Sequence, residues 1–263
     1  MNNNDILTLK KWIKESKKIV VFSGAGISVP SGIPDFRSAN GIYNTEYDGL
    51  SPEEIISHSF FMKNPKMFYK FYFDKMIYLN AEPNLAHKYF AEIGATIVTQ
   101  NIDNLHTLAG SKIVYELHGN VYRNYCMKCN KFYDLKDLKV GEVPYCECGG
   151  MIKPDVVLYE EGLDSNTIMG AIKSISEADM LIIVGTSLRV YPAAGFINYY
   201  KGNKLVLLNK EKTPFDSSCN LAIYGDIVEI VKELKKSPKG LFFILLRLLQ
   251  LGKLLHKHHN RYI

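Results

Sequence analysis

The sequence predicts an α/β protein built on a parallel sheet with helices on both faces. Short runs rich in Val and Ile end in glycine or polar residues, and helical patterns separate most of these runs. Two further stretches interrupt the alternation: one is helical and rich in aromatic residues, and the other holds four closely paired cysteines. A smaller domain is therefore expected beside the sheet.

The length and composition indicate a globular protein. Of the 263 residues, 47% are apolar and 22% are charged, and a chain of this length can bury a sizeable core. No apolar run reaches the roughly 20 residues that a membrane-spanning helix needs. The polar N-terminal segment lacks the apolar core of a signal peptide and has helical spacing instead. We therefore expect a cytoplasmic protein.

The positive charge is concentrated in the C-terminal tail. The net charge is +5, but seven of the 32 Lys and Arg residues lie from Lys235 onward, where there is no Asp or Glu. Residues 1–234 thus carry 25 basic and 27 acidic side chains. Because nucleic-acid binding needs a basic face, a zinc-ribbon module that binds nucleic acid is the disfavoured alternative, and no specific nucleic-acid partner is expected.

Five apolar runs are the expected strands, at residues 19–22, 95–99, 156–159, 180–184 and 205–208. Ligands bind at the C-terminal ends of the strands in such sheets. Each run is followed there by a polar or glycine-rich stretch, in order SGAGIS, QNIDNLH, EEGL, GTSL and NKE. The binding site is expected along this edge of the sheet.

The cysteine spacing predicts a metal site. Two close pairs, Cys126 with Cys129 and Cys146 with Cys148, lie 16 residues apart, and glycines follow the second pair. In a cytosolic chain this spacing is typical of a zinc ribbon, in which four thiolates complete a tetrahedral site. Free thiols or a disulfide are the alternative. With four thiolates bound, the zinc would have no open position for water and would be structural.

The first strand runs into a glycine turn, Gly24-Ala25-Gly26, followed by Ser28. Glycines at such a turn let backbone N–H groups approach a pyrophosphate, although a tight structural turn would also explain them. Just beyond it, the segment Asp35-Phe36-Arg37 brings an acid, an aromatic ring and a guanidinium to the place where they would cover a dinucleotide.

Taken together, these motifs resemble one family. The segments GAGIS…SGIPDFR, TQNIDNLH, LHGN, the paired cysteines, KPDVVLYEE and GTSLRVYPAA occur in the order found in the sirtuin family of NAD-dependent protein deacylases, over about residues 5–235. The resemblance implies a Rossmann-like NAD-binding domain at 1–40, 93–121 and 153–236. It also implies a small domain made of a helical module at 41–92 and a zinc ribbon at 122–152.

The same resemblance assigns roles to the stretch after the second strand. Asp103 would hold the nicotinamide carboxamide, and Gln100 and Asn101 would bind ribose hydroxyls. Ile102 and Phe36 would pack on the nicotinamide ring. The further cofactor contacts implied are Val29, Gly185, Thr186, Ser187, Asn209, Lys210 and Ile227.

His118 is the expected general base, and Asn101 is grouped with it as catalytic. A histidine titrates near neutral pH and can take a proton from a ribose hydroxyl. His106 is expected to have a structural role on the following helix. In the implied reaction the acyl-lysine oxygen attacks the nicotinamide ribose, and water then gives free lysine, nicotinamide and O-acyl-ADP-ribose.

The substrate is implied to be an acyl-lysine protein. Val157, Tyr159 and Glu160 fall where the family pairs its backbone with the peptide, although VVLYEE departs from the commoner Phe-Gly before Glu. Family members that remove succinyl groups carry Tyr-x-x-Arg, where this chain has Tyr72 and Lys75. Lys lacks the bidentate fork of Arg, so acetyl is the expected acyl group. Removal of acidic or longer acyl groups and ADP-ribosyl transfer are the alternatives.

The resemblance fades in the apolar and basic tail, residues 237–263. Polar residues recur there every three or four positions in a sequence that is otherwise mostly Leu, Ile and Phe. Such a helix either packs on the sheet domain or on a second subunit, or lies at a membrane surface. Contact with a membrane is expected only through this tail.

Overall fold

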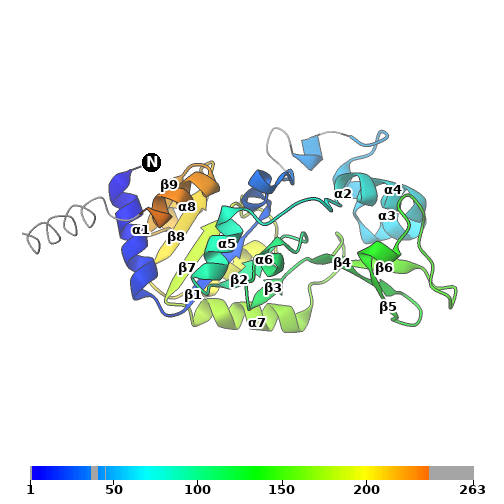
Figure 1. The fold of residues 1–263 in the computed structure, drawn as a ribbon. Coiled ribbons are helices and arrows are strands. Elements are labelled where there is room, and N and C mark those ends of the chain that lie inside the picture. The colour runs from blue at the N-terminus through cyan, green and yellow to red at the C-terminus, as the bar shows by residue number, and fades with distance from the viewer. Residues whose placement is uncertain (1, 37–40, 45, 237–263) are drawn as a thin grey trace, which may run out of the picture.

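The computed structural model describes residues 2–36, 41–44 and 46–236. The predictions made for the tail at 237–263 and for Arg37 lie outside these residues. Two sheets organise the described chain, as Figure 1 shows: a large parallel sheet and a small antiparallel sheet beside it. Within the described residues, no helix is long and apolar enough to cross a membrane.

The large sheet has six parallel strands in the order β3-β2-β1-β7-β8-β9. They are β1 (Ile19–Ser23), β2 (Thr96–Thr99), β3 (Val114–Glu116), β7 (Met180–Val184), β8 (Leu205–Asn209) and β9 (Leu221–Tyr224). The chain crosses from β1 to β2 on one side and from β3 back to β7 on the other. Since β1 lies at this reversal, its C-terminal end is where a doubly wound sheet opens for a ligand.

Alternate residues of β1 face two separate hydrophobic cores. Val21 belongs to the core that α1 (Asn3–Glu15), α5 (Leu85–Glu92) and α8 (Ile227–Lys235) cover. Phe22 belongs to the core on the opposite face, beneath α7 (Ser165–Ser176). Every residue of β1 is buried, which is why this strand is a continuous apolar run and not an alternating one.

The small sheet has the order β5-β4-β6, made of β4 (Gly119–Cys126), β5 (Phe132–Asp134) and β6 (Ile152–Val156). Three helices pack beside it, α2 (Pro52–Ile55), α3 (His58–Lys63) and α4 (Pro65–Lys75). Helix α6 (Leu105–Leu108) lies between β2 and β3 in the chain. A single core joins the helical stretch to the cysteine stretch, and it includes Phe68, Tyr69 and Cys146. The predicted smaller unit is therefore built from both insertions.

Three expectations about the elements need correction. The run 156–159 is not a strand of the parallel sheet, because β6 ends at Val156 and pairs antiparallel with β4. Strands β3 and β9 were not predicted, because they are only three and four residues long. Helix α5 lies inside the segment expected as the helical module, yet its buried residues Ala86, Tyr89 and Phe90 pack on the large sheet.

Candidate active site

A deep cleft of about 590 Å³ lies at the C-terminal ends of β1, β2, β7 and β8 and extends to the small unit. It gathers most of the predicted site. The predicted residues that line it are Gly24, Ala25, Gly26, Val29, Asp35, Phe36, Gln100, Asn101, Ile102, His118, Val157, Tyr159, Glu160, Gly185, Thr186, Ser187, Asn209, Lys210 and Ile227. Ser28, Asp103 and Lys75 line a narrower pocket of about 40 Å³, which shares Ala25, Phe36, Asn101 and Ile102 with the cleft.

The glycine turn after β1 is packed directly against the turn after β7. The N–H of Gly26 donates to the carbonyl oxygen of Gly185 at 2.8 Å. A Cβ atom built on Gly26 would lie 2.8 Å from both the Cα and the carbonyl oxygen of Gly185. The absence of a side chain at this position therefore has a structural cause, in addition to giving a phosphate access to the backbone.

Ser28, Asn101 and Asp103 form a buried polar cluster at the narrow pocket. The Ser28 hydroxyl donates to the Asp103 carboxylate at 2.6 Å, and the Asn101 amide donates to Ser28 Oγ at 3.0 Å. The N–H of Leu105 also donates to Asp103, at 2.9 Å. Burial raises the pKa of Asp103, while the hydrogen bonds oppose that rise. The cluster fixes a carboxylate where it can accept from a carboxamide.

Gln100 presents an unpartnered donor at the cleft. Its side-chain oxygen accepts from the Thr186 hydroxyl at 3.0 Å. The amide nitrogen is then buried with no hydrogen-bond partner among the described residues. A buried donor left unpaired is costly, and the residue that carries it lines the cleft.

The imidazole of His118 has one defined tautomer. Its Nδ1 lies 3.0 Å from the carbonyl oxygen of Gln100, and a carbonyl can only accept, so Nδ1 carries the proton. The other ring nitrogen, Nε2, is left with its lone pair on a ring that lines the cleft. Burial lowers the pKa of His118, which keeps the imidazole neutral near physiological pH. It can therefore accept a proton there.

His106 lies away from the cleft, in the interior. It is on α6, as expected, and its Nε2 lies 2.9 Å from the buried hydroxyl of Ser23. Its ring meets that of His87 edge-on, with centroids 4.8 Å apart. Burial lowers the pKa of His106 well below the ordinary value. This placement agrees with the structural role expected for it.

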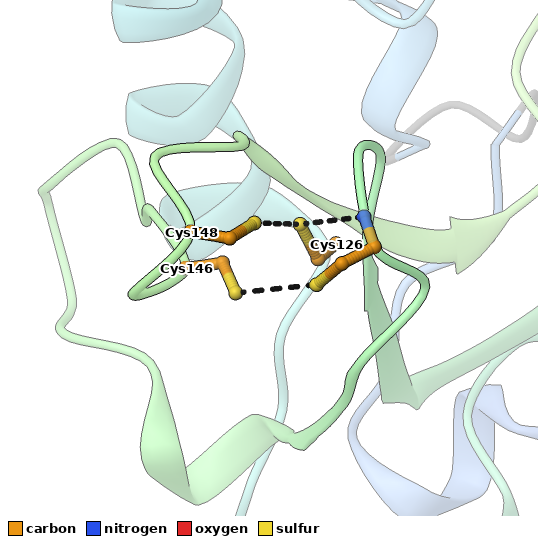
Figure 2. A group of neighbouring side chains, drawn as sticks. Cys126, Cys146 and Cys148 are labelled. Atoms are coloured by element: carbon orange, nitrogen blue, oxygen red, sulfur yellow. Dashed lines mark hydrogen bonds between the residues drawn. The ribbon is translucent and has the colours of Figure 1, made fainter.

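The four paired cysteines come together in the small unit. All four sulfur atoms lie within 4.8 Å of one another, and Figure 2 shows Cys126, Cys146 and Cys148 pointing toward a common point. The Sγ–Sγ distances are 3.4 Å for Cys126 with Cys148 and 3.6 Å for Cys129 with Cys146. These exceed the roughly 2.05 Å of a disulfide. They are near the roughly 3.8 Å expected for sulfurs that share one tetrahedral zinc, so the donor set fits a structural zinc.

The segment after β6 is attached to the helical stretch. Tyr159 uses both of its backbone groups there: its N–H donates to Ile56 and its carbonyl accepts from His58, at 3.1 and 3.0 Å. The predicted backbone pairing of Tyr159 with a substrate is therefore not available in this structure. The Glu160 carboxylate accepts from the N–H and hydroxyl of Ser59, at 2.8 and 2.9 Å.

The position of Tyr72 does not fit the substrate-binding role predicted for it. Its side chain is fully buried in the aromatic core, stacked on Phe68 with ring centroids 5.7 Å apart. It lines neither the cleft nor the narrow pocket. Lys75, one turn further along α4, lines the narrow pocket, and its ammonium lies 3.3 Å from the Asp74 carboxylate. The two residues do not form a joint acyl-binding pair.

Comparison with known proteins identifies the family. Residues 24–192 match the model of the Sir2 family. A protein of Clostridium perfringens named NAD-dependent protein deacetylase is 55% identical over 238 residues, which are 87% of this chain and 98% of the relative. One of Staphylococcus aureus with the same name is 43% identical over 238 residues, covering 88% of this chain and 98% of the relative.

This chain belongs to the Sir2 family.

Solved Sir2 structures share its fold. A complex of a Sir2 variant with a deacetylated p53 peptide and 3′-O-acetyl ADP ribose superposes with a TM-score of 0.80 at 38% identity, covering 87% of this chain and 96% of that one. A complex of Sir2 with a p53 peptide and NAD+ superposes with a TM-score of 0.78 at 38% identity, covering 89% and 97%.

The cleft of this Sir2 chain also has residues that sequence reasoning missed. Tyr43 lines it opposite Tyr159, and Arg189, Tyr191 and Lys212 line it beyond the glycine turns. Tyr43 lies in the aromatic stretch at 41–92, whose side chains were expected to be mostly core or cleft lining, but it was not singled out. The other three follow strand ends, where only the first residues of each turn were predicted to contact the cofactor.

Proposed function

We propose that this chain is an NAD-dependent protein deacetylase, which removes the acetyl group of acetyl-lysine and yields nicotinamide and O-acetyl-ADP-ribose. The observation that carries the proposal is the state of His118, a neutral imidazole with Nε2 free to take a proton inside a cleft lined by the Gly24–Gly26 turn. Relatives named NAD-dependent protein deacetylase support it, because this chain matches 98% of the length of each.

The residues of the cleft fit NAD. The close packing of Gly26 on Gly185 leaves only backbone at the turn, where a phosphate can approach it. Gln100 lines the cleft with an amide that can bond to ribose hydroxyls. The Asp103 carboxylate, held by Ser28, provides an acceptor for a carboxamide. When bound, NAD supplies the ribose carbon that receives the acetyl oxygen as nicotinamide leaves.

In this proposal His118 moves the proton. Its Nε2 accepts a proton from a ribose hydroxyl, and the Gln100 carbonyl stabilises the imidazolium that forms, because Nδ1–H already donates to it. A general base placed in this way contributes about 10²- to 10⁴-fold to the rate. Asn101 acts beside it as a binding residue, oriented by its own bond to Ser28.

The acetyl-lysine peptide is proposed to lie along Val157 and Glu160. The N–H of Val157 donates to the His118 carbonyl at 3.0 Å, which fixes this segment next to the base. The zinc that the four cysteines fit is structural in this proposal. It would hold together the small unit, which forms the opposite wall of the cleft.

The proposal is tested by incubating the protein with NAD and an acetyl-lysine peptide and following all products by mass spectrometry. Equal amounts of deacetylated peptide, nicotinamide and O-acetyl-ADP-ribose are expected. Parallel reactions with succinyl- and long-chain acyl-lysine peptides test the acyl preference. ADP-ribosylated protein in place of deacetylated peptide would contradict the proposal.

A further inference from the structure

Two tyrosines that are far apart in the sequence meet across the cleft. The hydroxyl oxygens of Tyr43 and Tyr159 lie 3.2 Å apart, within hydrogen-bond distance. Both side chains line the cleft, and Tyr159 is 38% exposed. The contact spans the opening between the segment after the glycine turn and the segment after β6. We refer to this contact as the tyrosine bridge.

One end of the bridge is firmly anchored. The backbone groups of Tyr159 are bonded to Ile56 and to His58, the first residue of α3. The carboxylate of the next residue, Glu160, accepts two hydrogen bonds from Ser59. Glu161 extends this anchorage, since its carboxylate accepts from the N–H of Leu158 at 2.9 Å. The backbone that carries the Tyr159 ring is thus fixed to the small unit, next to the segment proposed to bind peptide.

The other end is tied to Phe36. The N–H of Tyr43 donates to the Phe36 carbonyl at 2.9 Å, and their rings pack with centroids 5.1 Å apart. Phe36 lines both the cleft and the narrow pocket that holds Ser28 and Asp103. A displacement of the Tyr43 ring therefore changes the packing of Phe36 at the place proposed for nicotinamide.

We propose that the tyrosine bridge positions Phe36 and thereby couples the peptide-binding segment to the nicotinamide site. This inference rests on the proposed deacetylase function. The contacts form one continuous path from the Tyr159 hydroxyl through the Tyr43 ring to Phe36. A peptide bound beside Val157 and Glu160 meets the exposed Tyr159 ring, so peptide and cofactor act on the same bridge. Tyr43 and Tyr159 are positioning residues in this account.

The test removes one hydroxyl at a time. Tyr43→Phe and Tyr159→Phe each delete the bridging oxygen and keep the ring, and the double variant deletes both. One net hydrogen bond corresponds to about two- to tenfold in an equilibrium constant. We therefore expect the KM for NAD and the inhibition constant of nicotinamide to rise about two- to tenfold in each single variant, with kcat little changed. The double variant should be no worse than either single variant, because both remove the same interaction.

Tyr145→Phe is the matched control. Tyr145 is an exposed tyrosine in the cysteine segment, and it lines neither the cleft nor the narrow pocket. It should leave both constants unchanged. Unchanged constants in the single variants would contradict the proposed role of the tyrosine bridge. So would a double variant whose effect is the product of the two single effects.

A second measurement separates this inference from the proposed function. The dissociation constant of NAD, measured by calorimetry without peptide, should rise in the same two- to tenfold range in all three bridge variants. Lack of deacetylation by the wild-type protein would refute the proposed function alone. If the variants retain their melting temperatures and bind NAD as the wild type does, only the proposed role of the tyrosine bridge is refuted.

Discussion

The carbonyl oxygen of Gln100 holds the imidazole of His118, with 3.0 Å between that oxygen and Nδ1. The bond sets the tautomer, since the carbonyl cannot donate, and it joins the end of β2 to the start of β4. The proposed base is thus oriented by the backbone of a residue whose side chain faces the same cleft. The orientation does not depend on any flexible side chain.

Replacement of His118 by Ala is expected to lower kcat by about 10²- to 10⁴-fold, because the proton acceptor is lost. Deacetylation of a peptide at saturating NAD measures this. The variant should keep its zinc content and its circular dichroism spectrum, since no core residue changes. Turnover near that of the wild type would show that His118 is not the general base.

The pH dependence of the reaction should reflect the burial of His118. Burial lowers its pKa below the ordinary value of about 6.5, and the base works only in its neutral form. Activity should therefore be retained as the pH falls to 6.5 and should be lost below it, as the ring is protonated. The acid limb of kcat/KM against pH measures this. A midpoint clearly above 6.5 would contradict the assignment.

The sequence predicted the location of the site correctly where its polar residues directly follow a strand. The polar residues after β1, β2, β7 and β8 were placed correctly along one edge because parallel strands end together. The run at 156–159 was misassigned for a physical reason. A short apolar run does not reveal which sheet it joins, and here Pro154 and its neighbours pair with β4 and not with the parallel strands.

The sequence did not show which side chains face the cleft. Tyr72 and Lys75 were paired by their resemblance to Tyr-x-x-Arg, yet Tyr72 packs in the aromatic core and Lys75 lines the narrow pocket. Tyr43 was missed because its contact in the cleft is with Tyr159, 116 positions away. Such long-range contacts leave no local pattern in the sequence.

Gly119 offers a test of how the small unit is joined to the base. It follows His118 directly, has φ of +78°, and a Cβ atom there would lie 1.8 Å from the carbonyl oxygen of Asp155. Gly119→Ala should lower the free energy of unfolding by at least about 3 kcal/mol, because a backbone clash adds to the cost of the left-handed conformation. It should also lower kcat by displacing His118.

Gly141→Ala is the control for Gly119→Ala. Gly141 has φ of +82°, nearly the same, but a Cβ atom there would meet nothing within 4 Å. Its cost should be only the about 1–2 kcal/mol of the backbone conformation. Urea denaturation of both variants gives the comparison. Equal losses would show that the approach of Asp155 is unimportant.

The cysteine cluster should carry one zinc per chain. Cys146→Ser removes a buried thiol from the core of the small unit. It should lower the metal content and reduce Tm by about 10 °C or more, since the binding free energy of a structural zinc is folding free energy. Cys219→Ser, outside the cluster, should keep the zinc. Full metal occupancy and an unchanged Tm for Cys146→Ser would contradict a four-thiolate site.

Lys75 provides the last prediction, on acyl preference. A carboxylate-gripping pair would need a tyrosine and a cation facing one acyl group, but Tyr72 is buried in the core and the Lys75 ammonium lies beside Asp74. Lys75 lines the narrow pocket and not the cleft wall formed by Val157. We therefore expect Lys75→Arg to leave the ratio of desuccinylation to deacetylation unchanged within about twofold, even though Arg has the bidentate fork. Side-by-side kcat/KM values for acetyl- and succinyl-lysine peptides measure the ratio. A rise of tenfold or more in desuccinylation would show that this position does face the acyl group and that the fork of Arg alone can bind its carboxylate.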